Sequence, residues 1–205
     1  MSVPLGDSRV VLDAPAGYAD TTFLGSPRLQ ELAESHTSAS NRVLMFAITD
    51  DDLRRFSGGV TPEFRRYLMV VTQKATERER ITPAAFQRMV GDSMRDFRAP
   101  PAGVDVVKHL EKQPVGVPSA LAELRKDAAV LSVLQGTRLQ PTVIPGFFSN
   151  SERQNYLLSS STLMLVRGKV INLAVFTVYD SPADAERVRT LTLRWTEDLQ
   201  RLNSR

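Results

Sequence analysis

A pair of apolar segments joined by a very short turn constrains the fold more than any other feature of this sequence. Residues 162–166 and 170–179 are almost entirely apolar or β-branched, and Arg167, Gly168 and Lys169 separate them. Such residues favour extended backbone, and glycine supplies the positive φ that a tight turn needs. We therefore predict an antiparallel hairpin here, and a fold built on it must contain an antiparallel sheet.

Other segments carry strand signals of different strength. Residues 42–49 and 66–72 are apolar nearly throughout, which is typical of strands buried on both faces. Proline and glycine interrupt or end the weaker strands, because neither suits a continuous ladder. The weaker signals are a first strand at 9–13, ended by the turn at 14–17; a strand at 142–148, broken by Pro145 and Gly146; and the start of another strand at 154–159.

Three hydroxyl–proline pairs predict helix starts, at Ser26-Pro27, Thr82-Pro83 and Ser181-Pro182. The hydroxyl is a good N-cap, and proline suits the first helical turn. Three acids at residues 50–52 would likewise favour the start of a short helix through residue 56. Two of the predicted helices carry an apolar stripe: Phe86, Met89, Val90, Met94 and Phe97 in the middle helix, and Val188, Leu191, Trp195, Leu199 and Leu202 in a last helix over residues 182–203.

The segment at about 102–140 is the hardest part to interpret. Residues 104–111 fit either a strand end or a short helix. Ser119 could cap a helix that continues through Ala120, Leu121, Leu124 and Ala128 and reaches Gly136, although residues 128–134 of the same segment also fit a strand. The helix is the favoured interpretation, and an insertion in this region is compatible with the pattern.

These elements predict an α+β fold. Hairpin-joined strands with helices at the flanks indicate a central antiparallel sheet covered by helices on both faces, with a long C-terminal helix lying across it. The chain has 205 residues, which is enough for one substantial core, so we expect a single domain over residues 1–205. No apolar run approaches the ~18 residues of a membrane-spanning helix, so no membrane span is expected.

Composition excludes several classes of site. The sequence has no cysteine and two histidines, which removes disulfides, thiolate metal sites and a cysteine nucleophile. The net charge is +3, and acids dilute the most basic stretch, residues 54–98. A nucleic-acid binder concentrates basic residues on one face, so we expect no nucleic-acid partner, although a site for an anionic partner stays open as a minor alternative.

No residue group satisfies the requirements of a catalytic, cofactor or metal site, and the expectation is a non-enzymatic protein without a cofactor. The glycine-rich phosphate loops, the zinc-protease motif and the nucleophile elbow are all missing. We expect structural roles for the remaining candidates, which are His36, His109 with Glu111, Asp50, Asp51 and Asp52, Arg167 with Lys169, and Asp13 and Asp20 around Tyr18.

Three segments resemble a known group of proteins. They are the opening strand and turn at residues 10–18, the helix start at 81–86, and the hairpin at 166–179 that leads into the terminal helix with Trp195. The layout resembles uncharacterised, commonly exported proteobacterial proteins related to the PsbP fold, an α/β/α sandwich. Its members with known roles are non-enzymatic and dock onto larger proteins, and the matching motifs are structural, so no functional residue is transferred.

The resemblance implies a non-enzymatic accessory module of the cell envelope with an unidentified protein partner. It also implies a periplasmic location, which agrees with a first strand close to Met1 as in a mature exported domain; a cytoplasmic protein is the alternative. A second hypothesis is a small-molecule or lipid carrier, with the stripe at residues 86–97 lining a cavity. A hydrolase without a recognisable motif is the remote third.

Overall fold

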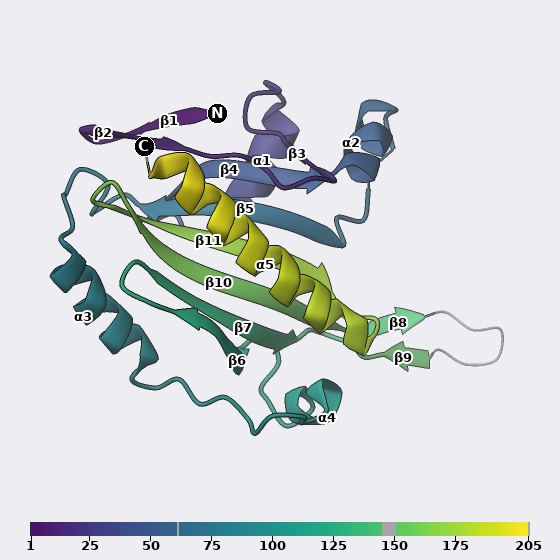
Figure 1. Cartoon of the computed structure of the whole chain (residues 1–205). Coiled ribbons are helices and arrows are strands. Elements are labelled where there is room, and N and C mark those ends of the chain that lie inside the picture. The colour runs from purple at the N-terminus through teal and green to yellow at the C-terminus, as the bar shows by residue number, and fades with distance from the viewer. Residues whose placement is uncertain (61, 145–150, 205) are drawn as a thin grey trace.

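A seven-stranded antiparallel sheet organises the computed structural model, which describes residues 1–60, 62–144 and 151–204 (Figure 1). The α+β prediction is confirmed, since helices pack on this sheet. In spatial order, the strands of this described sheet are β3 Tyr18–Asp20, β4 Asn41–Thr49, β5 Arg66–Gln73, β11 Lys169–Val178, β10 Tyr156–Val166, β7 Val130–Arg138 and β6 Pro118–Lys126.

The predicted hairpin forms the centre of the sheet. Strands β10 and β11 pair along their whole length and close at Val166 and Lys169. Arg167 and Gly168 have φ values of 50° and 78°, the positive values of a two-residue hairpin turn. β10 also continues without a break from Tyr156, so the two strand signals at 154–159 and 162–166 belong to one strand.

One face of the sheet is covered by the long helix α5, Pro182–Asn203, and by a hairpin of β1, Ser2–Leu5, and β2, Ser8–Val11 (Figure 1). Val188, Trp195 and Leu199 pack against sheet residues such as Leu158 and Leu173. The helix has the predicted bounds, but Leu202 is exposed, and the polar Asn203 takes the buried position. The sequence analysis also missed β1, a four-residue strand that includes Pro4.

Two separate groups of helical residues cover the opposite face. Leu29 and Ala33 of α1, Pro27–Ser35, pack on β4 and β5 together with side chains of α2, Asp50–Ser57. Phe86 and Val90 of α3, Pro83–Met94, pack on β7 and β10. Helices therefore lie on both faces, as predicted. Of the predicted stripe, Phe86, Val90, Met94 and Phe97 pack in this cluster, with Phe97 beyond the end of α3, while Met89 is not part of it.

The prediction of a helix after Ser119 is wrong. Residues 118–126 and 130–138 form strands β6 and β7, and the one helix described in this region is the short α4, Val106–Leu110. Ala120, Leu121, Ala122 and Leu124 favour a helix when considered alone. Pairing with β7 overrides that preference, since β-structure depends strongly on the neighbouring strand.

A smaller hairpin follows, formed by β8, Thr142–Ile144, and β9, Ser151–Arg153. The strand predicted at 142–148 is confirmed over its first three residues, and its remainder lies outside the described residues. Across the part of the chain that the structure describes, no helix combines the length and apolar character needed to span a bilayer.

Candidate functional site

Five arginines line an open cleft of about 1010 Å³ where α2, the start of β5 and α5 meet. We call it the arginine-lined cleft. Its acidic residues are Asp51, Asp52, Glu63 and Glu186, so both signs of charge are present. The five arginines are Arg55, Arg65, Arg66, Arg187 and Arg194.

Helical spacing explains why α5 contributes one wall. Glu186, Arg187, Thr190 and Arg194 recur at intervals of three and four residues, which places them on one side of the helix. The opposite wall begins at Thr49, whose hydroxyl accepts a hydrogen bond from the Asp52 N–H at 3.1 Å and so caps α2. Short local sequence signals thus position side chains that lie more than a hundred residues apart.

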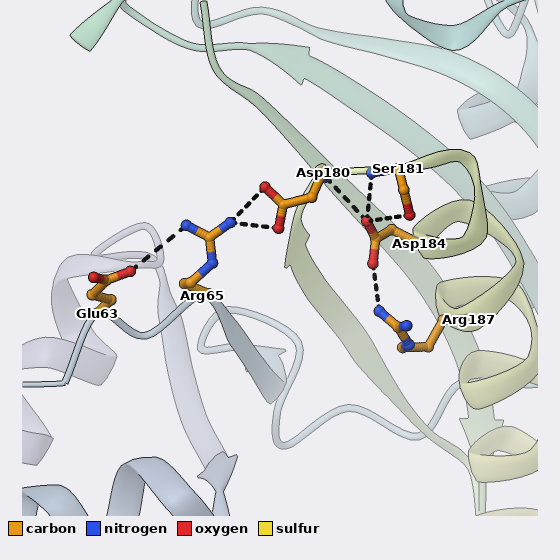
Figure 2. Close-up of polar contacts among 6 residues, drawn as sticks. All are labelled: Glu63, Arg65, Asp180, Ser181, Asp184 and Arg187. Atoms are coloured by element: carbon orange, nitrogen blue, oxygen red, sulfur yellow. Dashed lines mark hydrogen bonds and ion pairs between the residues drawn. The ribbon is translucent and has the colours of Figure 1, made fainter. Parts of the chain in front are cut away.

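Three charged residues of the cleft, Glu63, Arg65 and Arg187, belong to a connected chain of polar contacts, shown in Figure 2. Arg65 donates two hydrogen bonds to Asp180, at 2.7 and 2.5 Å, and its guanidinium lies 3.6 Å from Glu63. The hydrogen bond to Asp180 raises the pKa of Arg65. This pair fastens the start of β5 to the connection between β11 and α5.

Asp184 continues the chain at the N-terminus of α5 (Figure 2). Its carboxylate accepts hydrogen bonds from the N–H groups of Asp180 and Ser181, at 3.0 and 2.9 Å, and pairs with Arg187. Burial would raise the pKa of Asp184, but the two N–H donors and the Arg187 charge outweigh it and hold the pKa below its usual value. The Asp184–Arg187 pair therefore fixes the first turn of α5.

The remaining three arginines of the cleft have no such partners. Arg55, Arg66 and Arg194 are exposed, and no side chain in the described part of the chain forms a hydrogen bond or ion pair with their guanidinium groups. Tyr18 also lines the cleft. Burial raises the pKa of its phenol, and the charges of Arg66 and Arg187 oppose that rise. The part of the cleft lined by Arg55, Arg66 and Arg194 therefore presents hydrogen-bond donors suited to carboxylates or other anions.

The candidate residues from the sequence lie in scattered positions in the structure. Asp52 and Asp51 line the cleft, where Asp51 pairs with Arg54. Asp20 accepts hydrogen bonds from the N–H and hydroxyl of Thr22, and the carbonyl of Asp13 accepts one from Trp195. Asp13 and Asp20 are thus used in turns and packing and do not line the cleft. Tyr18, which lies between them in the sequence, lines the cleft together with Asp51 and Asp52.

The hairpin turn and His36 have local structural partners. Lys169 is fully buried, donates to the Glu79 carbonyl and pairs with Asp7 at 2.9 Å. Arg167 donates to the carbonyls of Arg9 and Asn203. His36 lies on the other side of the sheet, with Nδ1 2.8 Å from the Leu32 carbonyl oxygen.

The imidazole of His109 lies next to the hydroxyl of Ser119, a pair of residues that the sequence analysis did not connect. Its Nε2 lies 3.0 Å from Oγ of Ser119. A nucleophile–base pair needs a third group that orients the base. Within the described residues no carboxylate hydrogen bonds to His109, and neither residue lines the arginine-lined cleft. The pair joins α4 to β6.

The described residues contain no group of three or more histidine or acidic side chains arranged to hold a metal ion. Comparisons with protein-family models, with curated proteins and with solved structures found no match to this chain.

Proposed function

We propose that this chain is a non-enzymatic interaction module that docks onto a protein partner through the arginine-lined cleft. The observation that carries the proposal is the convergence of three exposed guanidinium groups, Arg55, Arg66 and Arg194, from three different elements. Arginine is enriched among the residues that dominate binding at protein interfaces, where its planar group pairs with carboxylates. The expected partner presents an acidic surface.

The mixed charge of the cleft favours a protein over a nucleic acid. Asp51, Asp52, Glu63 and Glu186 stand among the arginines, and they would repel a phosphate backbone. A protein surface carries both signs and can match the pattern, which gives specificity as well as attraction. The carrier hypothesis has less support, because Phe86 and Val90 are fully occupied by packing on the sheet.

The resemblance to the PsbP-like group supports an accessory role in the cell envelope, with the periplasm as the proposed compartment. Fractionation of the native host, followed by detection with an antibody, tests the location. Recovery in the periplasmic fraction is the expected result. Recovery in the cytosol alone would contradict the location and exclude an envelope partner.

Charge reversal tests the docking proposal. The variant carries Arg55→Glu, Arg66→Glu and Arg194→Glu, and its control carries Arg78→Glu, Arg88→Glu and Arg189→Glu, which are also exposed arginines but lie outside the cleft. Both variants change the net charge by the same amount. Chemical cross-linking in host extract, with the parent chain as bait, first identifies candidate partners by mass spectrometry.

Direct binding of the purified candidate then decides. We expect the cleft variant to bind at least about 100-fold more weakly, because two or more charged contacts are reversed, and the control to bind like the parent. Equal binding by all three chains would remove the cleft from the interface and overturn the proposal. Circular dichroism of each variant confirms that the fold is retained.

A further inference from the structure

We propose that the outer edge of β4 accepts an extended peptide strand of a protein partner. β3 lies beside β4 but pairs with it only at Ala47, Ile48 and Thr49. In the described part of the chain, no strand pairs with the outer side of residues 41–45. An unpaired strand edge presents backbone N–H and C=O groups, which another extended segment can satisfy.

Other parts of the chain hydrogen-bond to the two ends of this edge, at Phe46 and at Asn41, and the stretch between these residues has no outer strand in the described part of the chain. The Thr21 N–H donates to the Phe46 carbonyl at 2.8 Å, and the Thr22 hydroxyl accepts from the Phe46 N–H at 3.1 Å. At the other end the Asn41 N–H donates to the Ser38 carbonyl at 2.9 Å. Between these caps a short additional strand would continue the line of β3.

A groove of about 620 Å³ runs along the same edge and is bordered by α1. Leu29, Ala33 and Val43 give it an apolar wall, while hydroxyl and amide groups of Thr22, Ser26 and Gln30 line its rim. Side chains alternate across a strand, so every second residue of an added strand would face this wall and the others would face the side on which β1 lies. The groove and the edge together therefore fit a peptide with alternating apolar and polar residues.

Two large apolar side chains stand beside the groove without cover. Phe23 is 72% exposed and Leu24 is 52% exposed, and the loop that carries them continues into groove residues Thr22 and Gly25. A partner strand in the groove would place its flanking residues near this loop. Burial of two such side chains would add apolar contact area to a short hydrogen-bonded pairing.

The opposite edge strand of the sheet, β6, is much less suited to pairing with an added strand than β4. β6 begins with Pro118, has two register shifts and carries Glu123, Arg125 and Lys126, all features that discourage edge pairing. β4 has one register shift, between Val43 and Met45, which limits an added strand to a few backbone hydrogen bonds. The groove contacts must then supply the remaining affinity.

This site shares no residue with the arginine-lined cleft, so the two proposals can fail separately. The test uses the full chain labelled with ¹⁵N and an N-acetylated, C-amidated pentapeptide Thr-Val-Thr-Val-Thr as the probe. A second peptide has the same sequence with its valine amide nitrogens methylated, which removes two N–H donors. NMR chemical shifts report where each peptide binds.

We expect saturable shift changes at the amides of Val43 and Leu44, and at least about tenfold weaker binding by the methylated peptide. Gln30→Trp, which fills the groove, should abolish the changes; Glu31→Trp, on the same helix but outside the groove, should retain them. Spectral dispersion shows that both variants are folded. No shift change with up to 5 mM probe (about the weakest affinity of interest), equal binding by both peptides, or changes located elsewhere would each overturn the proposal.

Discussion

At the scale of single residues, polar side chains of α5 fasten this helix to parts of the chain far away in sequence. The Trp195 Nε1–H donates to the Asp13 carbonyl at 2.7 Å, and Asn203 both accepts from the Val11 N–H and donates to its carbonyl. Among the described residues, no buried side-chain nitrogen or oxygen lacks a partner. A buried polar group is costly without such a partner, so these contacts also specify where the helix lies.

Trp195→Ala should destabilise the protein strongly. Trp195 is 1% exposed in the main core, and its truncation leaves a cavity that costs about 3–5 kcal/mol. Trp195→Phe keeps most of the apolar contact and should cost less, about 1–2 kcal/mol, chiefly from the lost hydrogen bond to Asp13. Urea denaturation measures both values. A parental unfolding midpoint for Trp195→Ala would show that the tryptophan does not hold the core together.

Asp184→Asn should reduce stability in a pH-dependent manner. The pKa of Asp184 is lowered in the folded protein, so its carboxylate contributes stability at pH values above the unfolded pKa of about 3.9, and this contribution is lost as the pH falls through the folded pKa. We expect a loss of about 1 kcal/mol at pH 7. The difference from the parent should shrink as the pH is lowered from about 5.

Asp198→Asn is the matched control for that experiment. Asp198 pairs with Arg201 at the same i,i+3 spacing on α5, but both side chains are more than half exposed. Exposed pairs contribute little, so this substitution should change the unfolding free energy by less than about 0.5 kcal/mol at any pH. A loss for Asp184→Asn that stays constant between pH 7 and pH 3 would contradict the assigned role of the charge.

At the scale of elements, the sequence predicts those structures whose signals are local. Capping pairs such as Thr82-Pro83 and Ser181-Pro182 identify α3 and α5, and the apolar run in β4 identifies a central strand. The segment from Ser119 fails because its alanines and leucines suit a helix, and its strand form depends on β7. β1 escapes prediction for a similar reason, since four residues with a proline become a strand through pairing with β2.

Gly136 shows how closely α4 approaches the sheet at this mispredicted region. A Cβ atom at this position would lie 2.8 Å from one methyl carbon of Leu110 and 2.9 Å from the other, and 3.1 Å from Leu121. Gly136→Ala should therefore destabilise the protein by about 1–3 kcal/mol, because the buried Leu110 side chain must move.

In a Leu110→Ala background the same glycine substitution should cost less, since the clashing methyl groups are absent. We expect a coupling of at least about 0.5 kcal/mol in a double-mutant cycle measured by urea denaturation. Equal costs of Gly136→Ala in the two backgrounds would show that α4 does not pack on β7 in this way.

At the scale of the whole molecule, the topology decides where charge gathers, and the sequence alone does not show it. Arg55 and Arg66 belong to the basic stretch at residues 54–98, which acids dilute in the sequence, and Arg194 lies on the last helix. The cleft exists because the order of the strands brings the start of β5 beside α5 (Figure 1). The seven-residue spacing of Arg187 and Arg194 does predict that they share one side of α5. Which residues lie opposite them in the cleft depends on the fold and cannot be predicted from this spacing.

The distribution of the remaining basic residues argues against nucleic-acid binding. Lys74 lies in the groove beside α1, Arg80 packs against Gly168, and Arg95 pairs with Asp92. The basic stretch is therefore divided among different surfaces, and the net charge is only +3. Tight binding to DNA needs many phosphate contacts on one face.

We therefore expect no sub-micromolar binding to a duplex DNA of about 20 base pairs at about 150 mM salt, because non-specific contacts alone give dissociation constants of about 1–100 μM. Fluorescence anisotropy across a salt series measures this. Sub-micromolar binding with a steep salt dependence would contradict the prediction. If the variant with glutamate at positions 55, 66 and 194 then lost that binding, the phosphate contacts would lie in the arginine-lined cleft, and the proposed acidic protein partner would have to be replaced by a nucleic acid.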